Sequence, residues 1–388
     1  MRRILLLLAV ILVGSVGVVT AVAAAGGSGL PQVLPPPVPP AVVTYTPAAG
    51  AADVDAAAPA SVTVQEGTFE EVTLTAEGAP AEGALNAERT QWSSTAPLAA
   101  GTSYTWGGTV KGRDGNTVPL QGSFATKAPS RLVRGTLNIG DGRTVGVAAP
   151  IRIQFNSHVT DRAAVERALT ITTSVPVEGS WGWLPDEGGG SRVDYRPKEY
   201  WPTGTKVTVT AKLRGVNYGD DAAGAADISS TFRIGSAQVV KADVNSHRMI
   251  VMRDGVQVAD FPASYGLASD PERNTRSGIH VVSEKFTDKR MVSERYDYDL
   301  IEKWAVRISN NGEFIHANPA SAGAQGSANV THGCVNLSIE DAEAYYNMAQ
   351  YGDPVEVTGT PIALSARDGD IWDWTLSWEQ WKALSALD

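Results

Sequence analysis

The stretch "FIHANPASAGAQGSANVTHGCVNLS", which runs from Phe314 to Ser338, decides how this sequence is interpreted. It contains two of the five histidines and the only cysteine of the 388-residue chain, Cys334. The segment "EFIHA" predicts a strand ending near His316, and a loop rich in Gly and Ala follows it. A lone cysteine cannot form an internal disulfide. Its thiol is therefore reactive, linked to another chain, or buried as a small apolar side chain.

A cysteine attacks as the thiolate, so it needs a base whose own orientation is held by a third group. His332 lies two residues before Cys334, and in an extended segment their side chains run parallel, which suits lining a site. His316 is the better base, because a flexible loop allows it to approach from a neighbouring strand. We expect the carbonyl oxygen of Ala317 or Asn318 to hold its second ring nitrogen.

Other residues around the cysteine suggest how a substrate would be bound. Successive N–H groups of Gly333 and Cys334 are candidates for an oxyanion hole in acyl transfer. Asn336 is either a substrate-binding side chain or a turn residue before a helix. A metal site built on His316, His332 and Cys334 would lack the usual fourth ligand or second cysteine, so neither a metal nor another cofactor is expected. His280 either faces the site or fills a core position.

Residues 236–360 are predicted to be mostly β with one helix. The stretch "QVVKADVNSHRMIVMRDGVQVADFPASYG" predicts a hairpin of two strands around Arg253-Asp254-Gly255, because Asp-Gly is a strong turn signal. Ser338, three residues before Asp341, predicts the start of a helix after the cysteine, and Gly352-Asp353 predicts its end.

The final residues, 361–388, form an extension rich in tryptophan. Ser377 and Gln380 fit a capping box, which predicts a short helix. Trp378, Trp381 and Leu384 would share one face of that helix. We expect this face to cover apolar surface of residues 236–360 or of the module before them.

Residues 44–128 and 129–235 are predicted to be two consecutive immunoglobulin-like sandwich modules. Both contain short alternating stretches separated by turn residues, as in "ASVTVQ" and "TKVTVTAKL". They resemble divergent copies, with Gly101-Thr102 matching Gly204-Thr205 and a phenylalanine in the last strand of each, Phe124 and Phe232. The tryptophans here favour packing roles, with carbohydrate stacking as the alternative. The predicted fold class of the chain is mainly β.

The N-terminus predicts export. Arg2 and Arg3 precede an uncharged apolar run, so residues 1–25 are either a cleaved signal peptide or a membrane anchor. Six prolines between Pro31 and Pro40 predict a stiff linker over residues 26–43. The rest of the chain is expected outside the cytoplasm, secreted or anchored on the cell-wall side of the membrane. The net charge of -10 excludes general binding to nucleic acid.

The segment "THGCVN", Thr331–Asn336, resembles the [S/T]-H-G-C-x-N signature of L,D-transpeptidases with a YkuD-type domain. His316 lies within the family's spacing, and "RSGIH", Arg276–His280, resembles its upstream turn and strand. The layout resembles the actinobacterial type: a membrane-proximal segment, two immunoglobulin-like modules, a catalytic β-domain and a Trp-rich extension. The resemblance covers nearly the whole chain, and residues 236–360 would be the catalytic domain.

The resemblance implies a peptidoglycan cross-linking enzyme that acts on donor and acceptor tetrapeptide stems. Cys334 would attack the bond before the terminal D-alanine, and a diaminopimelate amine would then attack the thioester, which gives a 3→3 link. His316 would serve as base and then acid, while Thr331, His332 and Asn336 bind substrate. Tyr298 matches a lid tyrosine of the oxyanion site. Carbapenems are expected to acylate the cysteine.

The sequence departs from the family at two positions. The residue after the base is usually Ser in the actinobacterial type and is Ala317 here, a change expected to be harmless if only the backbone carbonyl orients the histidine. A methionine of the lid-side strand corresponds to Ser283. Three alternatives to cross-linking stay open: an L,D-carboxypeptidase, an acyltransferase that attaches a protein to the wall, and a non-catalytic wall-binding protein. The intact cysteine and base count against the last.

Overall fold

The structure, a computed structural model, describes residues 38–365 and 372–387. Strands far outnumber helices over these residues, which confirms the mainly-β prediction. The predicted signal or anchor at residues 1–25 and most of the linker at 26–43 lie outside the described residues. None of the helices in the described residues combines the length and the apolar composition that a membrane span requires.

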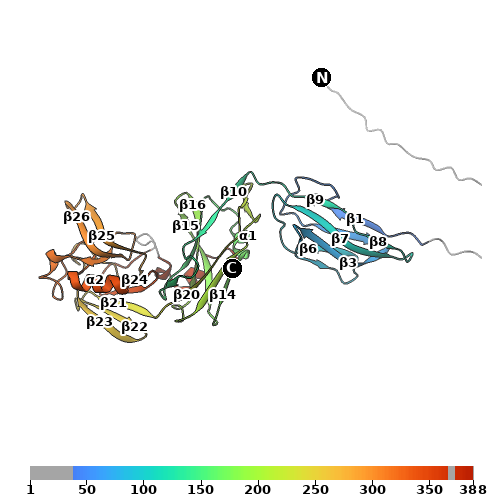
Figure 1. Cartoon of the computed structure of the whole chain (residues 1–388). Coiled ribbons are helices and arrows are strands. Elements are labelled where there is room, and N and C mark those ends of the chain that lie inside the picture. The colour runs from blue at the N-terminus through green and yellow to red at the C-terminus, as the bar shows by residue number, and fades with distance from the viewer. Residues whose placement is uncertain (1–37, 366–371, 388) are drawn as a thin grey trace, which may run out of the picture. The chain divides into compact units, whose positions relative to one another are not determined.

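The first module is a sandwich of two sheets (Figure 1). One sheet has the order β1-β2-β6-β5, and the other has β4-β3-β7-β8 with β9 also paired to β7. Val62, Trp92 and Phe124 belong to the hydrophobic cluster of this module. The strands are β1 (Val42–Thr46), β2 (Ser61–Gln65), β3 (Gly67–Ala76), β4 (Ala79–Pro80), β5 (Gly83–Leu85), β6 (Gln91–Ser94), β7 (Ser103–Gly112), β8 (Thr117–Pro119) and β9 (Ser123–Ala125).

The second module repeats this arrangement with sheets of order β11-β13-β16-β15 and β12-β20-β17-β14, and a small sheet β10-β19-β18. The predicted correspondence of the modules is visible in their turns, because Gly101 and Gly204 both have a positive φ before matching strands. The elements are β10 (Arg131–Val133), β11 (Gly135–Leu137), β12 (Thr144–Val145), β13 (Ile151–Phe155), α1 (Arg162–Arg167), β14 (Leu169–Thr173), β15 (Gly179–Glu187), β16 (Gly190–Pro197), β17 (Lys206–Ala211), β18 (Asn217–Gly219), β19 (Ala222–Gly224) and β20 (Ile228–Ile234).

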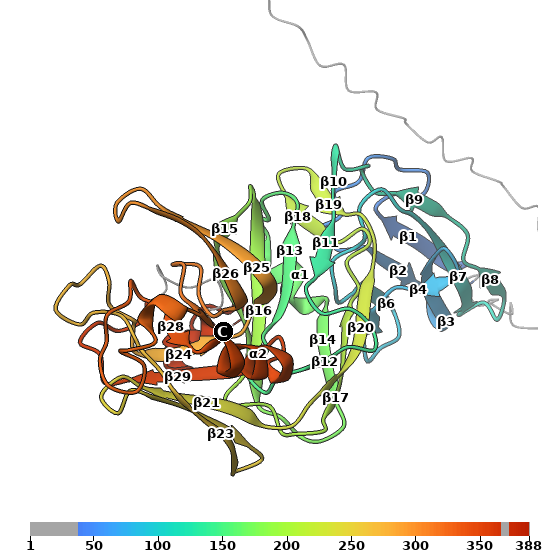
Figure 2. The ribbon, with the colours of Figure 1, turned by 60° about the vertical axis from the view of Figure 1, so that its left-hand side comes forward.

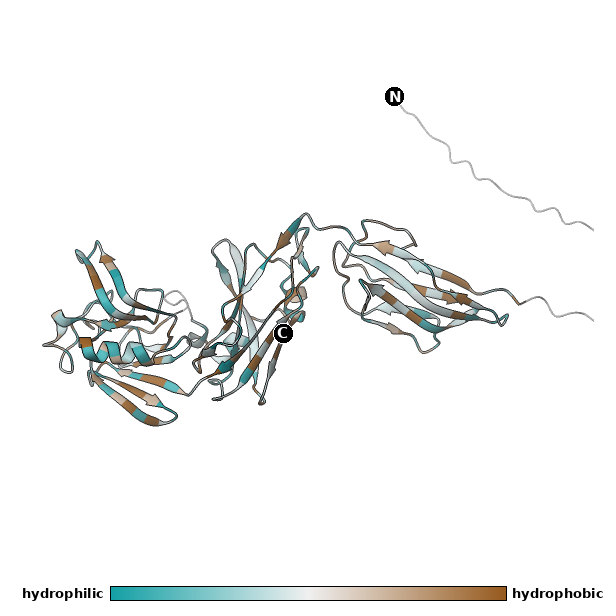
Figure 3. Ribbon diagram, in the orientation of Figure 1, coloured by the Kyte–Doolittle hydropathy of each residue, from teal (hydrophilic) through white to brown (hydrophobic). Residues whose placement is uncertain are grey.

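The region after residue 236 contains two sheets and one long helix. The sheets have the orders β23-β22-β21-β29-β24 and β25-β26-β27-β28. Apolar and polar residues alternate along their strands (Figure 3), and the apolar ones form a third hydrophobic cluster. The elements are β21 (Gln238–Asp243), β22 (Arg248–Arg253), β23 (Val256–Pro262), β24 (Gly278–Val281), β25 (Glu284–Ser293), β26 (Tyr298–Arg307), β27 (Phe314–Ala317), η1 (Pro319–Ser321), β28 (Val335–Leu337), α2 (Ile339–Met348) and β29 (Pro354–Thr358).

The turn signals of this region are confirmed, with one correction. Asp254 and Gly255 have positive φ and join β22 to β23, as the Asp-Gly pair predicts. The same stretch also contains β21, so it forms three strands and not two. The extra turn, around Asn245, carries no Gly to reveal it. The side chain of Ser338 caps α2 by accepting from the N–H of Asp341 at 3.1 Å.

The C-terminal extension packs on the second module. Its elements are η2 (Asp373–Thr375) and α3 (Trp378–Lys382), and α3 begins with the predicted capping box. The indole of Trp381 is fully buried beside Gly182 and donates to the carbonyl oxygen of Ser180 at 3.0 Å. Trp374 donates to the carbonyl oxygen of Ala148 at 2.9 Å. Trp374 also packs with Val281 of β24, and the N–H of Leu364 donates to the carbonyl oxygen of Ser277. The residues after 360 therefore contact both of the surfaces expected, the second module and the region after residue 236.

Three large hydrophobic clusters follow one another along the described chain. Their buried members lie within residues 60–124, 133–234 and 240–357. We therefore keep the predicted domain limits at residues 128, 235 and 360 as a proposal.

Candidate active site

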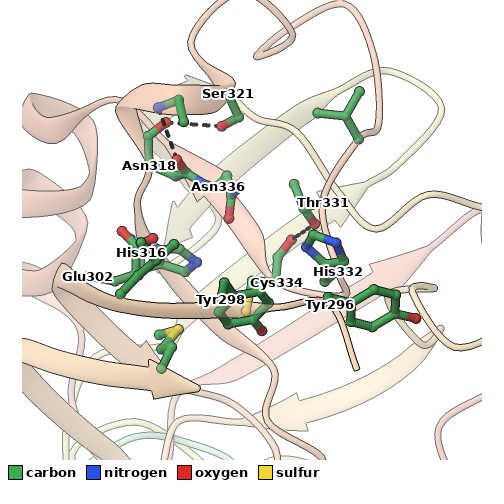
Figure 4. A pocket seen from close by; sticks show the side chains of 14 residues that line it. Tyr296, Tyr298, Glu302, His316, Asn318, Ser321, Thr331, His332, Cys334 and Asn336 are labelled. Atoms are coloured by element: carbon green, nitrogen blue, oxygen red, sulfur yellow. Dashed lines mark hydrogen bonds and ion pairs between the residues drawn. The ribbon is translucent and has the colours of Figure 1, made fainter. Parts of the chain in front are cut away.

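A cavity of about 340 Å³ lies in the third region, between the β25–β26 hairpin and the loop that ends at Cys334 (Figure 4). In Figure 2 the hairpin extends as a long two-stranded ribbon. Most of the predicted site residues line this cavity. The lining residues are Met291, Tyr296, Tyr298, Leu300, Glu302, His316, Asn318, Ala320, Ser321, Val330, Thr331, His332, Cys334 and Asn336.

Two parallel strands bring the predicted base to the predicted nucleophile. β27 pairs with β28 so that His316 lies opposite Asn336, and Cys334 directly precedes β28. The loop between the strands contains η1, whose first turn is capped when Asn318 Oδ1 accepts from the N–H of Ala320 at 3.0 Å. The prediction that His316 approaches from a neighbouring strand is confirmed.

The turn that carries Cys334 is held by two threonines. Gly333 has φ of +116°, a conformation that other residues rarely adopt. Thr275 Oγ1 donates to the carbonyl oxygen of Gly333 at 2.8 Å, and Thr331 Oγ1 donates to that of Cys334 at 2.7 Å. The N–H of Gly333 points at Thr331 Oγ1 over 3.4 Å. Because that hydrogen bond is long, the N–H of Gly333, a predicted oxyanion donor, can replace it with a hydrogen bond to a substrate.

His316 is buried, and two acceptors face its Nδ1 atom. The carbonyl oxygen of Ala317, one of the two acceptors expected, lies 2.9 Å away, and Glu302 Oε2 lies 3.5 Å away. Burial alone would lower the pKa of His316, but hydrogen bonds to Cys334 and Glu302 and their charges raise this pKa to about 10. The sequence analysis missed Glu302. The pattern that could have identified Glu302 is the alternation of side chains along β26, which places it on the same face as Tyr298.

The β25–β26 hairpin supplies one wall of the cavity. Tyr298, Leu300 and Glu302 alternate along β26, and Met291 lies opposite Leu300 on β25. A methionine, Met291, therefore lines the cavity from the hairpin. Ser283, to which the family's methionine position was assigned, lies outside the cavity lining. Strand pairing, and not distance along the chain, decides which residue faces the nucleophile.

Tilted aromatic contacts connect the hairpin to the nucleophile loop. The ring of His332 lies 4.4 Å from that of Tyr296 and 5.6 Å from that of Tyr298. Burial and the charge of Arg273 lower the pKa of His332, so this ring is neutral at pH 7. Burial and then the nearby Cys334 raise the pKa of Tyr298, so its phenol keeps its proton. His332 therefore lines the cavity as the sequence analysis expected.

Asn336 and His280 differ in their access to the cavity. Asn336 lies in β28, so the turn alternative for this residue is wrong, and its buried Oδ1 has no hydrogen-bond partner among the described residues. His280 is fully buried, with Nε2 2.9 Å from the carbonyl oxygen of Arg276 and Nδ1 3.7 Å from Glu313. It fills a core position and is not in the cavity lining.

The arrangement is suited to acyl transfer. Cys334 is a partly exposed thiol beside a buried imidazole whose far nitrogen is held by acceptors. A phenol donor and an unpaired amide oxygen face the same space. A nucleophile, a base with an orienting group, and candidate oxyanion donors are the parts that such chemistry requires.

Comparisons with known proteins agree with this geometry. The family described as the L,D-transpeptidase catalytic domain matches residues 237–357, and the bacterial Ig domain family matches residues 51–217. L,D-transpeptidase 5 of Mycobacterium tuberculosis (strain ATCC 25618 / H37Rv) is 55% identical over 355 residues, covering 91% of this chain and 78% of that protein.

A second relative, L,D-transpeptidase 2 of Mycobacterium tuberculosis (strain CDC 1551 / Oshkosh), is 35% identical and covers 87% of this chain and 83% of its own length. A solved structure of an L,D-transpeptidase in complex with imipenem is 32% identical with a TM-score of 0.50, and it covers 59% of this chain and 100% of that one. On its sequence, its fold and the parts of its site, the chain belongs to the L,D-transpeptidase family, whose members cross-link peptidoglycan.

Proposed function

We propose that the chain forms 3→3 cross-links between peptidoglycan stems through a thioester on Cys334. The observation that carries this proposal is the position of Cys334 beside His316, whose Nδ1 is held by the carbonyl oxygen of Ala317 at 2.9 Å. That arrangement leaves Nε2 of the imidazole free to exchange a proton with the thiol.

In the first half of the proposed reaction, Nε2 of His316 takes the thiol proton and Cys334 attacks the carbonyl carbon between diaminopimelate and the terminal D-alanine. The carbonyl oxygen becomes an oxyanion. The N–H groups of Gly333 and Cys334 and the protonated phenol of Tyr298 are the proposed donors to it. The C–N bond then breaks, and D-alanine leaves with the proton from His316. A thioester remains on Cys334.

In the second half, the side-chain amine of a diaminopimelate on an acceptor stem attacks the thioester carbon. His316 takes a proton from that amine and returns it to the departing sulfur, so the enzyme is restored. We propose that the unpaired Oδ1 of Asn336 accepts a hydrogen bond from a stem amide, with Thr331 and His332 lining the same space. Water in place of the amine would give the carboxypeptidase reaction, and an amine on a protein would attach that protein to the wall.

The proposal includes a location outside the cytoplasm, where the stems are. Its support is the sequence of the N-terminus, in which Arg2 and Arg3 precede an apolar run. It also includes acylation by carbapenems, supported by the related structure solved in complex with imipenem.

Purified disaccharide tetrapeptide stems provide the deciding test. Mass spectrometry should detect a 3→3 dimer, free D-alanine and a transient acyl adduct on Cys334. Release of D-alanine with tripeptide as the only other product would establish the carboxypeptidase instead. With imipenem the wild type should form an adduct that is absent in Cys334→Ala, and a folded wild type without adduct would exclude the enzyme proposal. His316→Ala should slow acylation far more than His332→Gln.

A further inference from the structure

Glu302 lies directly behind the predicted base. It occupies the cavity face of β26, and its Oε2 atom is 3.5 Å from Nδ1 of His316. The side chain of His316 is 4% exposed and that of Glu302 is 12% exposed, so water screens this pair little. Among the described residues, His316 is the only ionic partner of Glu302. In Figure 4 the carboxylate lies on the side of the imidazole away from Cys334.

Among the residues that the structure describes, no cation competes for the imidazole of His316. Lys289 is the cross-strand neighbour of Glu302, but its Nζ atom lies over the ring of Phe286, 4.4 Å from the ring centroid. Tyr298 and His332, which line the same cavity, are neutral at pH 7. The carboxylate of Glu313, two residues before Ile315, is bound by the N–H of Arg276 and by Ser309. Cys334 and Glu302 are therefore the charged groups that act on the imidazole.

We propose that Glu302 is a positioning residue whose carboxylate stabilises the imidazolium that His316 forms on taking the Cys334 proton. This inference rests on the proposed function only for the proton exchange between Cys334 and His316. The Nδ1 proton stays on the ring and is donated to the carbonyl oxygen of Ala317 throughout. Glu302 therefore contributes charge and takes up no proton.

A neutral acceptor and a charged one have different effects on the histidine. The carbonyl oxygen of Ala317 selects the tautomer and the ring orientation, because a hydrogen bond at 2.9 Å is directional. It does little to offset the burial that opposes a charged ring. A carboxylate within 4–6 Å of a cation favours the charged form, commonly by about one to three pKa units. Glu302 thus favours the charged form of His316, the form that the ring reaches when it takes the thiol proton.

Two pH profiles measured on Glu302→Gln test the proposal, because Gln keeps the shape and removes the charge. In the first, the rate of acylation by imipenem is followed from pH 5 to 10. The alkaline limb, where imidazolium is lost, should move down by about one pH unit in Glu302→Gln. Glu302→Asp keeps the charge at a slightly greater distance, so its limb should move in the same direction by a smaller amount, about half of the shift in Glu302→Gln. Asp299→Asn, which removes an exposed carboxylate from the same hairpin, is the matched control and should keep the wild-type profile.

The second profile uses iodoacetamide, which alkylates the thiolate without any acyl transfer. Because Cys334 is the only cysteine, alkylation reports this thiol alone. At pH 7 alkylation of Glu302→Gln should be slower than that of the wild type by up to about tenfold, the equivalent of one pKa unit, because a less basic His316 returns the shared proton to the sulfur. A wild type that imipenem does not acylate, together with this slower alkylation, would contradict the proposed function and leave the inference intact.

The opposite pattern would overturn the inference. If Glu302→Gln lowered acylation equally at every pH and left the alkylation profile unchanged, the side chain would serve only to pack the hairpin. If Glu302→Gln failed to fold, Glu302→Asp alone would decide. If the alkaline limb and the alkylation profile of Glu302→Asp were then identical to those of the wild type, the distance of the carboxylate from His316 would not matter, and the inference would be contradicted.

Discussion

The hydroxyl of Thr275 donates to the carbonyl oxygen of Gly333 at 2.8 Å, so a residue 58 positions earlier in the chain holds the peptide that precedes the nucleophile. The same hydroxyl accepts from the N–H of Gly266 at 2.8 Å. From the other side of the turn, Thr331 donates to the carbonyl oxygen of Cys334. The position of the thiol therefore depends on tertiary hydrogen bonds as well as on the glycine at 333.

Removing either hydroxyl should disturb both stability and reactivity. Thr275→Val leaves the carbonyl of Gly333 and the N–H of Gly266 without their buried partner, and each such loss costs about 1–3 kcal/mol. We expect a lower melting temperature and acylation by imipenem slowed by about tenfold, with a similar rate effect for Thr331→Val. Thr358→Val, at an exposed strand end, is the control and should change neither quantity. A destabilised Thr275→Val with wild-type acylation would show that the turn keeps its shape unaided.

The sequence predicted those features of the site that local chemistry determines. The helix starts at Ser338 and Ser377 were found because a capping side chain and the N–H groups it accepts from lie within one turn. The acceptor on Ala317 was one of the two expected, because Ala317 and Asn318 directly follow His316. Glu302 and Met291 were missed because their place depends on how β25 pairs with β26. The β25–β26 ladder has no pair at Trp304. Trp304 has a φ of +53°, a backbone conformation that tryptophan rarely adopts and that no sequence pattern indicates.

The role of Ala317 can be tested by restoring the serine that the actinobacterial type usually has. Because the backbone carbonyl already holds Nδ1 of His316 at 2.9 Å, a hydroxyl on the side chain has no orienting task left. Ala317→Ser should therefore change the rate of imipenem acylation by less than about threefold, since an added neutral hydrogen bond is worth only about 0.5–1.5 kcal/mol. The melting temperature, measured beside the rate, identifies any cost of burying the hydroxyl. An increase in rate of tenfold or more would mean that the carbonyl alone holds the histidine poorly.

The C-terminal extension should stabilise the second module without touching the chemistry. The Trp381 indole is fully buried, with the guanidinium of Arg196 5.3 Å from its ring centroid. Trp381→Ala should cost about 3–5 kcal/mol of unfolding free energy, as for other large buried aromatic side chains. Acylation at a temperature where the variant is folded should equal that of the wild type. Trp378→Ala, on the same helix but partly exposed, is the matched comparison and should cost clearly less.

Asp353 should make stability depend on pH in the direction opposite to most carboxylates. Its side chain is buried, with Oδ2 accepting from Gln238 Nε2 at 2.7 Å and from the N–H of Gln350 at 3.0 Å, and with Oδ1 unpaired among the described residues. Burial raises the pKa of Asp353 to about 7 from an ordinary value of 3.8. The folded protein thus favours the protonated carboxyl. The stability that this carboxyl contributes is complete below about pH 4 and is lost as the pH rises through 7.

Asp353→Asn cannot ionise, so it should avoid that loss. The free energy of unfolding of Asp353→Asn minus that of the wild type, measured with urea, should be near zero at pH 4. It should rise by a few kcal/mol at pH 8, since each pKa unit is worth about 1.4 kcal/mol. Asp288→Asn is the control, because the pKa of this exposed carboxyl is lowered by Lys303 and its removal should never stabilise the protein at high pH. A difference between Asp353→Asn and wild type that stays constant from pH 4 to 8 would show that the Asp353 carboxyl is ionised in the folded protein across that range.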